Sequence, residues 1–379
     1  MPIYSALSKY ISARSNGNTD VVRRYEKKAI TMISRRTYGK TVLAYFFSFA
    51  YRLLCSSESD EEINSIIKAH VSEKKWNNKE WLSHIKRDIY FTVFYNRINA
   101  DEFFRYQFET LSETGRHAYV GIAETLDAYR KLDDPEEQKI LENKYNTYCF
   151  FKDYYKREAI QINGFEDAAS FYDFCSRNSE FFVKPLSMGN GIGICSFNVG
   201  RDGDKEALFK KIINRCPVII EQPIRQAEEM AKYHPRSVNT IRVVTVQKEG
   251  IVRIVQTSVR LGVGDAIIDN ISHSGLSAAV DTGSGIIITP GRAAHRKELF
   301  LRHPDTNEQI IGNRIPDWEN LLQLVKLLAS KFGKQRIIGW DMAYSVEGWV
   351  VVEANSHPGI QILAESGVGV REVFEDIIR

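Results

Sequence analysis

Apolar residues recur at helical spacing through the first third of the chain. The clearest examples are residues 60–69 and 80–94, where apolar positions follow the 3.6-residue period of one helix face. Residues 1–115 contain few glycines, and their only proline is Pro2. This pattern predicts a helical N-terminal region over residues 1–115, in which no motif indicates catalysis.

The pattern changes after residue 115, where β-branched and aromatic runs alternate with helical segments. Asp134 and Pro135 have the residue types expected at a helix N-cap and first turn. Residues 281–285 predict a hairpin turn. The predicted helices are 134–144, 166–178, 318–332 and 370–378, and the predicted strands are 180–185, 217–221, 239–247, 251–260, 277–280, 285–289, 337–344 and 348–353. Such interleaving, with antiparallel hairpins, predicts an α+β domain over residues 116–379.

One apolar run, residues 41–51 continuing to 53–55, raises the question of a membrane segment. Arg52 interrupts it, and it is shorter than the ~20 residues that span a bilayer. We therefore predict a buried helix, with a membrane-surface or partner-facing helix as the alternative. Residues 1–10 lack the apolar core of a signal peptide. Together these features predict a cytoplasmic protein without a transmembrane segment.

Composition narrows the class of protein without identifying it. The chain has 379 residues, of which 43% are hydrophobic and 26% charged, as in ordinary globular proteins with two or three domains. A net charge of +3 gives no argument for nucleic acid as a partner. The five cysteines form no CxxC pair, which favours scattered reduced thiols over a disulfide framework or a zinc site.

Three oxygen-bearing side chains lie at the ends of two short apolar strands near the C-terminus. Asp341 and Glu353 flank a turn at residues 347–348, and Glu353 and Asn355 are two residues apart, so both point to one strand face. Hard oxygen ligands of this kind suit Mg²⁺ held together with substrate phosphates. The alternative is a surface hairpin with polar residues at its ends.

A second candidate is a lysine at the end of a strand, followed by a glycine-rich loop. Lys184 ends the apolar run 181–184, and Gly189, Gly191 and Gly193 follow. Glycines let backbone N–H groups approach phosphate oxygens, and Lys184 would neutralise phosphate charge. The loop matches neither the GxxxxGK[ST] nor the GxGxxG pattern, which disfavours those nucleotide folds. A flexible hairpin with turn-forming glycines is the alternative.

A third candidate is the end of the apolar strand 218–221. After Glu221, the residues Gln222 and Ile224 flank a proline, so their backbone groups are available to an adenine edge while Ile224 covers its face. Glu228 lies seven residues past Glu221 and would reach ribose hydroxyls. An ordinary strand end followed by a charged helix remains the alternative.

Two further features concern the reacting groups. Arg242 lies in the strand 239–247, and a buried arginine must be paired with a carboxylate or a bound anion. The loop 262–275 between two strands contains Asn270, His273, Ser274 and Gly275. Long loops of this kind usually hold substrate, so we predict that it lines the substrate pocket, with capping of the sheet as the alternative.

These features, in this order, resemble the ATP-grasp superfamily over roughly residues 130–379. The resemblance implies two α+β subdomains that clasp ATP, at about 145–225 and 226–379. It implies that Arg242 lies near the transferred phosphate. It assigns ATP binding to Lys144, Lys184, the lid glycines 189–193, Glu221, Gln222, Ile224 and Glu228, and two Mg²⁺ ions, replaceable by Mn²⁺, to Asp341, Glu353 and Asn355.

The sequence of the C-terminal half resembles that of one subgroup, the sugar-transfer-associated ATP-grasp proteins. The segments that carry this resemblance are 238–242, 269–275 and 353–359, although Ser274 stands where a second glycine is common. The resemblance implies carboxylate–amine ligation through an acyl phosphate in surface-polysaccharide pathways. Its implied partners are a small carboxylate such as a sugar acid, an amine such as an amino acid, and polysaccharide-assembly enzymes. A phosphotransferase using His357 or His273 as base, and a non-catalytic nucleotide-binding partner, remain alternatives.

Overall fold

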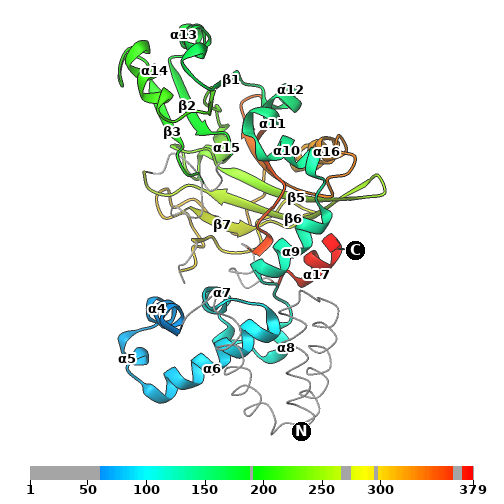
Figure 1. The fold of residues 1–379 in the computed structure, drawn as a ribbon. Helices are drawn as coiled ribbons and strands as arrows, with labels where there is room; N and C mark the ends of the chain where they lie inside the picture. Colours follow the sequence, from blue (N-terminus) through cyan, green and yellow to red (C-terminus); the bar gives the residue numbers. More distant parts are fainter. Residues whose placement is uncertain (1–59, 188–190, 266–274, 294–297, 362–368, 379) are drawn as a thin grey trace. The chain divides into compact units, whose positions relative to one another are not determined.

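The computed structural model describes residues 60–187, 191–265, 275–293, 298–361 and 369–378. The chain divides into two compact units, Met1–Ala123 and Glu124–Arg379. Figure 1 shows both units. The predicted helix 41–55 lies outside the described residues.

The described part of the first unit is helical, as the apolar periodicity predicts. Its elements are α4 (Asp60–His70), α5 (Glu73–Trp76), α6 (Lys79–Asn96), α7 (Ala100–Arg105), the 3₁₀ turn η1 (Phe108–Thr110) and α8 (Glu113–Arg116). A capping box explains where α7 begins, because Asn99 accepts a hydrogen bond from the Glu102 N–H and the Glu102 carboxylate accepts one from the Asn99 N–H. Phe103 and Phe108 are fully buried, and their rings contact each other edge to face.

The second unit contains two antiparallel sheets. The smaller has the order β1-β4-β2-β3, and its strands are β1 (Ala159–Ile162), β2 (Glu180–Pro185), β3 (Cys195–Asn198) and β4 (Val218–Glu221). The larger has the order β10-β9-β5-β6-β7-β8, and its strands are β5 (Thr240–Lys248), β6 (Ile251–Leu261), β7 (Leu276–Ala279), β8 (Arg292–Ala293), β9 (Ile337–Ser345) and β10 (Gly348–Asn355).

Helices cover one face of each sheet, as Figure 1 shows. The small sheet packs Phe181 and Val183 against α13 (Ala168–Arg177) and α14 (Lys205–Ile213). The large sheet packs Trp340 and Met342 against α16 (Trp318–Ala329). The remaining helical elements are α9 (Ile122–Leu132), α10 (Pro135–Glu142), α11 (Lys144–Phe150), α12 (Lys152–Tyr155), η2 (Phe165–Asp167), α15 (Glu228–Ala231) and α17 (Arg371–Ile378). Because side chains alternate along a strand, Arg242 and Asp341 lie on the opposite face of the large sheet from Trp340 and Met342.

The predicted α+β class is confirmed, and two local predictions are wrong. The predicted helix 134–144 ends at Glu142, because the Asn143 side chain accepts hydrogen bonds from Tyr145 N–H and Asn146 N–H and caps a new helix. Residues 285–289 form isolated bridges instead of a strand, since Ile286 pairs with Arg314 and Ile287 with Val280. The predicted turn at 281–285 is confirmed, with the Gly285 N–H donating to the Asp281 carbonyl.

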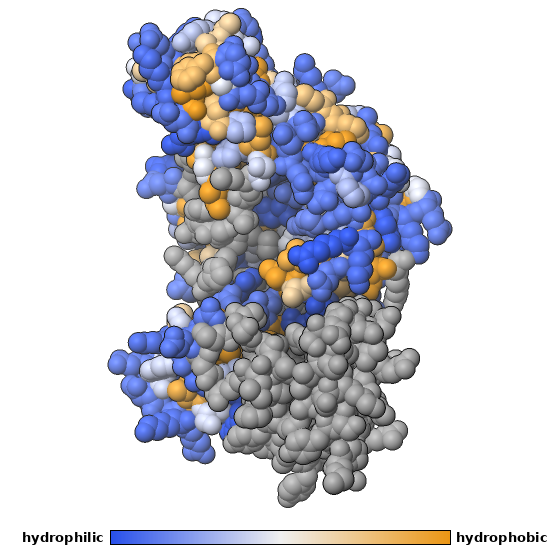
Figure 2. Space-filling model, viewed as in Figure 1, coloured by the Kyte–Doolittle hydropathy of each residue, from blue (hydrophilic) through white to orange (hydrophobic). Residues whose placement is uncertain are grey.

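On the face shown in Figure 2, hydrophilic residues cover most of the area that is not grey. No helix within the described ranges is long and apolar enough to cross a membrane.

Candidate active site

Glu221, at the end of β4, forms the centre of a buried ion-pair network. Its Oε1 lies 2.6 Å from the Lys184 Nζ on the neighbouring strand β2. Its Oε2 accepts a 2.6 Å hydrogen bond from the Arg157 Nε. Burial opposes ionisation, but the charges of Arg157 and Lys184 hold the pKa of Glu221 at about 2. Glu221 is therefore an anion whose charge is compensated twice.

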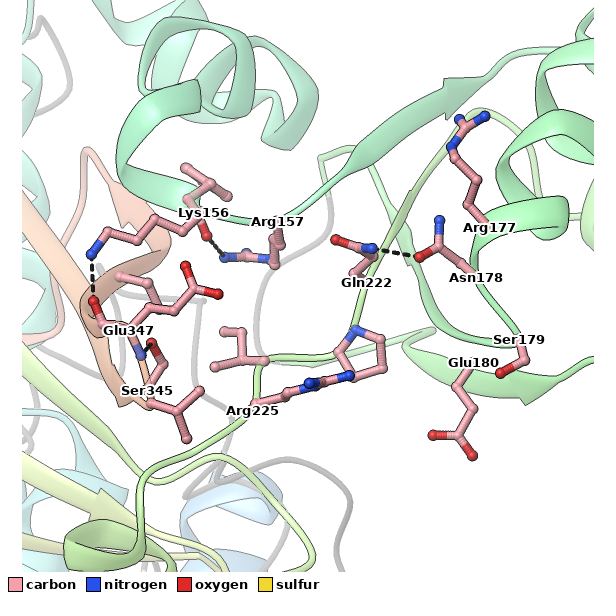
Figure 3. A pocket seen from close by; sticks show the side chains of 15 residues that line it. Lys156, Arg157, Arg177, Asn178, Ser179, Glu180, Gln222, Arg225, Ser345 and Glu347 are labelled. Carbon is pink, nitrogen blue, oxygen red and sulfur yellow. Dashed lines mark hydrogen bonds between the residues drawn. The ribbon is translucent and has the colours of Figure 1, made fainter.

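The segment after Glu221 lines a cavity of about 470 Å³. Its lining includes Gln222, Pro223 and Ile224 together with Lys156 and Arg157, and Figure 3 labels Gln222, Lys156 and Arg157 among the residues drawn. The Gln222 N–H donates to the Glu158 carbonyl, so the backbone groups left to a base at this position are the Gln222 carbonyl and the Ile224 N–H. We call residues 222–224 the hinge. These hinge residues line the cavity, and Lys184 does not.

Glu228 begins the short helix α15 and is exposed. It follows Ile224 by four residues, and the sequence predicts that it contacts ribose.

A β-bulge brings the predicted metal ligands to one face of the large sheet. Val351 pairs with Met342 on the core face, and Val352 is then extra, so Glu353 pairs with Asp341. In a regular strand Glu353 would lie on the same face as Val351, because side chains alternate. The bulge reverses that assignment. Asn355 follows on the same face, where its Nδ2 lies 3.5 Å from the Asp341 Oδ2.

Two arginines on the central strands hold Asp341. The Arg242 Nε donates to Oδ1 at 2.5 Å and its second terminal nitrogen donates to Oδ2 at 2.9 Å, which is a bidentate pair. Arg260 on β6 adds a bond to Oδ2 at 3.3 Å. Burial alone would raise the pKa of Asp341, but the charges of Arg242 and Arg260 lower it below its ordinary value. The partner of the strand arginine is thus a carboxylate.

Lys144, at the start of α11, contacts the β9–β10 hairpin directly. Its Nζ lies 3.0 Å from the Glu353 Oε1, and the two side chains are 15% and 32% exposed. The lysine that the resemblance assigns to ATP phosphate thus pairs with a carboxylate that it assigns to magnesium. Both side chains are partly exposed.

The glycine loop and the substrate loop are described only in part. Gly191 and Gly193, between β2 and β3, have φ angles of 70° and 78°, which favour glycine. Gly189 lies outside the described residues, as do Asn270, His273 and Ser274. Gly275 is buried immediately before β7, so the predicted loop does connect β6 to β7. Ser277 and Arg292 continue the polar face of the sheet there and are buried.

The oxygen donors of the hairpin fit a hard divalent cation. The pair with Lys144 involves Oε1 of Glu353, and Oε2 can accept a cation. Asp341 Oδ2 accepts from both arginines, whereas Oδ1 accepts from Arg242 alone and retains a lone pair. With the Asn355 amide oxygen, this set suits Mg²⁺ or Mn²⁺. This set contains two carboxylates and one amide. Among the described residues, there is no group of three or more His, Cys, Asp or Glu side chains that could hold a metal ion.

Sequence reasoning missed three residues of this region. Arg157 precedes β1 and gives no pattern signal, because it lies in a connection. Arg260 lies in an alternating strand, where its position on the same face as Arg242 could have identified it. The third residue is Asp133, whose carboxylate lies 2.6 Å from the His357 Nε2. The two residues are 224 positions apart in the sequence.

A family model described as sugar-transfer associated ATP-grasp matches residues 127–377. The chain belongs to this family. Its match confirms the predicted ATP-grasp fold and covers most of the second unit. No curated protein matches the chain.

Several solved structures are similar to the chain at low identity. D-alanyl-alanine synthetase A from Vibrio cholerae O1 biovar eltor has 13% identity and a TM-score of 0.40, with 65% of this chain and 66% of that chain covered. An N5-carboxyaminoimidazole ribonucleotide synthetase in complex with ADP has 12% identity and a TM-score of 0.39, with 61% and 52% covered. The D-alanine-D-alanine ligase from Helicobacter pylori has 14% identity and a TM-score of 0.37, with 63% and 59% covered. The chain thus spans about half to two thirds of these structures.

Proposed function

We propose that the chain is an ATP-dependent carboxylate–amine ligase that acts in surface-polysaccharide or related sugar-conjugate biosynthesis. The observation that carries this proposal is the face of the large sheet with Arg242, Asp341 and Glu353, which Lys144 of α11 contacts, so that cations and hard oxygen donors lie at contact distance. Such a face suits a triphosphate, a divalent cation and an acyl group together. Membership of the ATP-grasp family supports the same assignment.

In the proposed reaction, a carboxylate oxygen attacks the γ-phosphorus of ATP, and the bond to the bridging oxygen breaks to release ADP. The acyl phosphate then reacts with an amine, which loses a proton and displaces phosphate to form an amide. A free carboxylate is a poor acyl donor, so phosphorylation supplies the leaving group. Catalysis therefore needs positioning and charge neutralisation more than a nucleophilic side chain.

The residues of the chain divide these tasks. Lys144 and Lys184 leave Glu353 and Glu221 to bind phosphate oxygens, and the carbonyl of Gln222 and the N–H of Ile224 bind the base. Arg242 stabilises the acyl phosphate and the oxyanion that follows. Mg²⁺, held by Asp341, Glu353 and Asn355, would supply charge neutralisation at the β- and γ-phosphates. Asn270, His273, Ser274 and Gly275 remain our proposed contacts to the acceptor.

A pairwise screen of carboxylates against amines, measured as ADP formation, tests the ligase. Uronic acids and amino acids are the first substrates to combine. ADP formation that requires both partners supports ligation, with Glu353→Gln expected to abolish turnover while the protein stays folded. Near-normal ADP formation by folded Glu353→Gln protein would remove this residue from the mechanism.

One observation favours a second function, a phosphotransferase acting on a hydroxyl. His357 lies two residues past Asn355 and pairs with Asp133, an arrangement that orients an imidazole as a general base. ADP formation with a hydroxyl compound alone, yielding a phosphorylated product and no free phosphate, would establish that activity in place of ligation.

A further inference from the structure

Arg157 makes contacts that connect the two sheets of the second unit. It lies between α12 and β1, and its side chain is 4% exposed. One edge of the guanidinium pairs with Glu221 on the small sheet. One terminal nitrogen donates to the Val351 carbonyl on the large sheet at 2.7 Å, and the other, which also pairs with Glu221, lies 3.5 Å from the Val352 carbonyl.

The contacts on the large sheet fall on the β-bulge itself. A bulge leaves backbone groups of the extra residue outside the strand ladder, and the two carbonyls that Arg157 contacts belong to Val351 and Val352. This bulge determines that Glu353 shares a face with Asp341. Arg157 therefore stabilises the backbone geometry that orients a proposed metal ligand.

The contacts on the small sheet fall on the proposed nucleotide hinge. Glu221 immediately precedes Gln222, and Arg157 lines the hinge cavity with Gln222 and Ile224. The Tyr155 ring centroid lies 4.4 Å from the guanidinium carbon, and the Tyr155 carbonyl accepts a 3.2 Å bond. With five donors in a fixed plane, Arg157 cannot shift at one sheet without shifting at the other.

Charge balance alone does not explain Arg157. Glu221 carries one negative charge and is already paired with Lys184 at 2.6 Å. Arg157 is a second cation on the same carboxylate. It keeps Glu221 compensated when Lys184 moves to a phosphate, so that this movement does not leave an unpaired buried anion.

We propose that Arg157 is a positioning residue that couples occupancy of the nucleotide hinge to the metal-binding geometry of Glu353. This inference rests on the proposed function, because it assumes that the hinge binds a nucleotide and that Glu353 binds a cation. Lysine in its place can pair with Glu221 but cannot hold both carbonyls of the bulge. The coupling is therefore lost in Arg157→Lys while the charge is retained.

Calorimetry on the full chain tests the coupling. The affinity for a non-hydrolysable ATP analogue is measured with and without Mg²⁺, and the ratio of the two dissociation constants is compared between variants. The ratio is the dissociation constant without Mg²⁺ divided by that with Mg²⁺, so it measures how much Mg²⁺ strengthens binding. In Arg157→Lys we expect this ratio to fall by about 10- to 100-fold, the range for loss of a residue that supports a metal ligand. Binding of adenosine, which has no phosphate, should change less than threefold, or roughly 0.6 kcal/mol.

Arg371→Lys is the control, since Arg371 forms an ion pair with Glu124 at 3.0 Å outside the site, with a side chain that is 30% exposed against 4% for Arg157. It should keep the wild-type ratio. A folded Arg157→Lys protein with the wild-type ratio would overturn the coupling and leave the proposed function standing. A wild-type chain that binds no adenine nucleotide would overturn both.

Hydrogen exchange on the wild-type chain covers the case in which Arg157→Lys does not fold. ADP added without metal should slow exchange of the amides at 351–355, because hinge occupancy stabilises the bulge through Arg157. Unchanged exchange at those amides, with ADP bound, would overturn the coupling.

Discussion

At the scale of residues, the site consists of ion pairs whose members lie far apart in sequence. Lys144 pairs with Glu353, and Arg157 with Glu221. The sequence indicates which residue types carry the chemistry, because a strand's alternation assigns each side chain to a face. It does not indicate which cation meets which carboxylate, since that depends on how elements far apart in the sequence are brought together. Removing one member of such a buried pair typically costs ~3–5 kcal/mol.

The pair of His357 with Asp133 predicts a pH dependence of stability. The hydrogen bond that the His357 Nε2–H donates to the Asp133 carboxylate raises the pKa of His357 above its ordinary value. A raised pKa in the folded state means that the pair stabilises fully below the unfolded pKa, near ~6.5, and that this contribution is lost as pH rises through the folded pKa. The protein should therefore lose this part of its stability on the alkaline side.

Urea unfolding of the wild-type chain and His357→Gln at about pH 6 and about pH 8.5 measures this contribution. The difference in unfolding free energy between the two proteins should be largest at the lower pH and should shrink at the higher one. An equal difference at both values would mean that His357 contributes without its charge. The Asp133→Asn variant should show the same shrinking difference.

At the scale of elements, periodicity predicts the strands well and predicts their irregularities poorly. Strand 180–185 is predicted at its observed bounds. The bulge at Val352 leaves no trace in the apolar pattern, because valine fits either face. The apolar pattern also does not predict the helix break at Asn143. An asparagine can lie inside a helix, and only the structure shows that its side chain caps the next one. Both irregularities position site residues, namely Glu353 and Lys144.

A glycine in the turn before Ile286 gives a prediction at this scale. Gly285 has a φ of 74°, and an added Cβ would lie 2.6 Å from the Cγ of buried Trp318. Gly250, in the turn between β5 and β6, has a φ of 77° with no atom within 4 Å of an added Cβ. Gly250→Ala should cost about 1 kcal/mol for backbone conformation, and Gly285→Ala a further ~1–3 kcal/mol for overpacking. Denaturant unfolding of the two variants separates these terms, and equal losses would show that Trp318 moves aside without cost.

At the scale of the whole molecule, the proposed site belongs entirely to one unit. The family match at 127–377 and all site residues named above lie within Glu124–Arg379. The residues that form its buried core are also its own, including Trp318, Trp340 and Phe332. Nothing in the described part of the first unit supplies a phosphate-binding loop or a carboxylate cluster. The division of the chain therefore predicts that nucleotide binding does not require residues 1–121.

A fragment of residues 122–379, which keeps α9 (Ile122–Leu132) whole, tests this prediction. It should fold cooperatively and bind Mg²⁺ with an ATP analogue within about threefold of the full chain, a difference of roughly 0.6 kcal/mol. Glu353→Gln in the same fragment should weaken that binding, which shows that the fragment uses the same site. A fragment that unfolds cooperatively yet fails to bind, where the full chain binds, would assign part of the nucleotide site to the first unit. The full chain carrying Glu353→Gln distinguishes the two cases, because it should bind as weakly as the substituted fragment only if the site lies in the second unit.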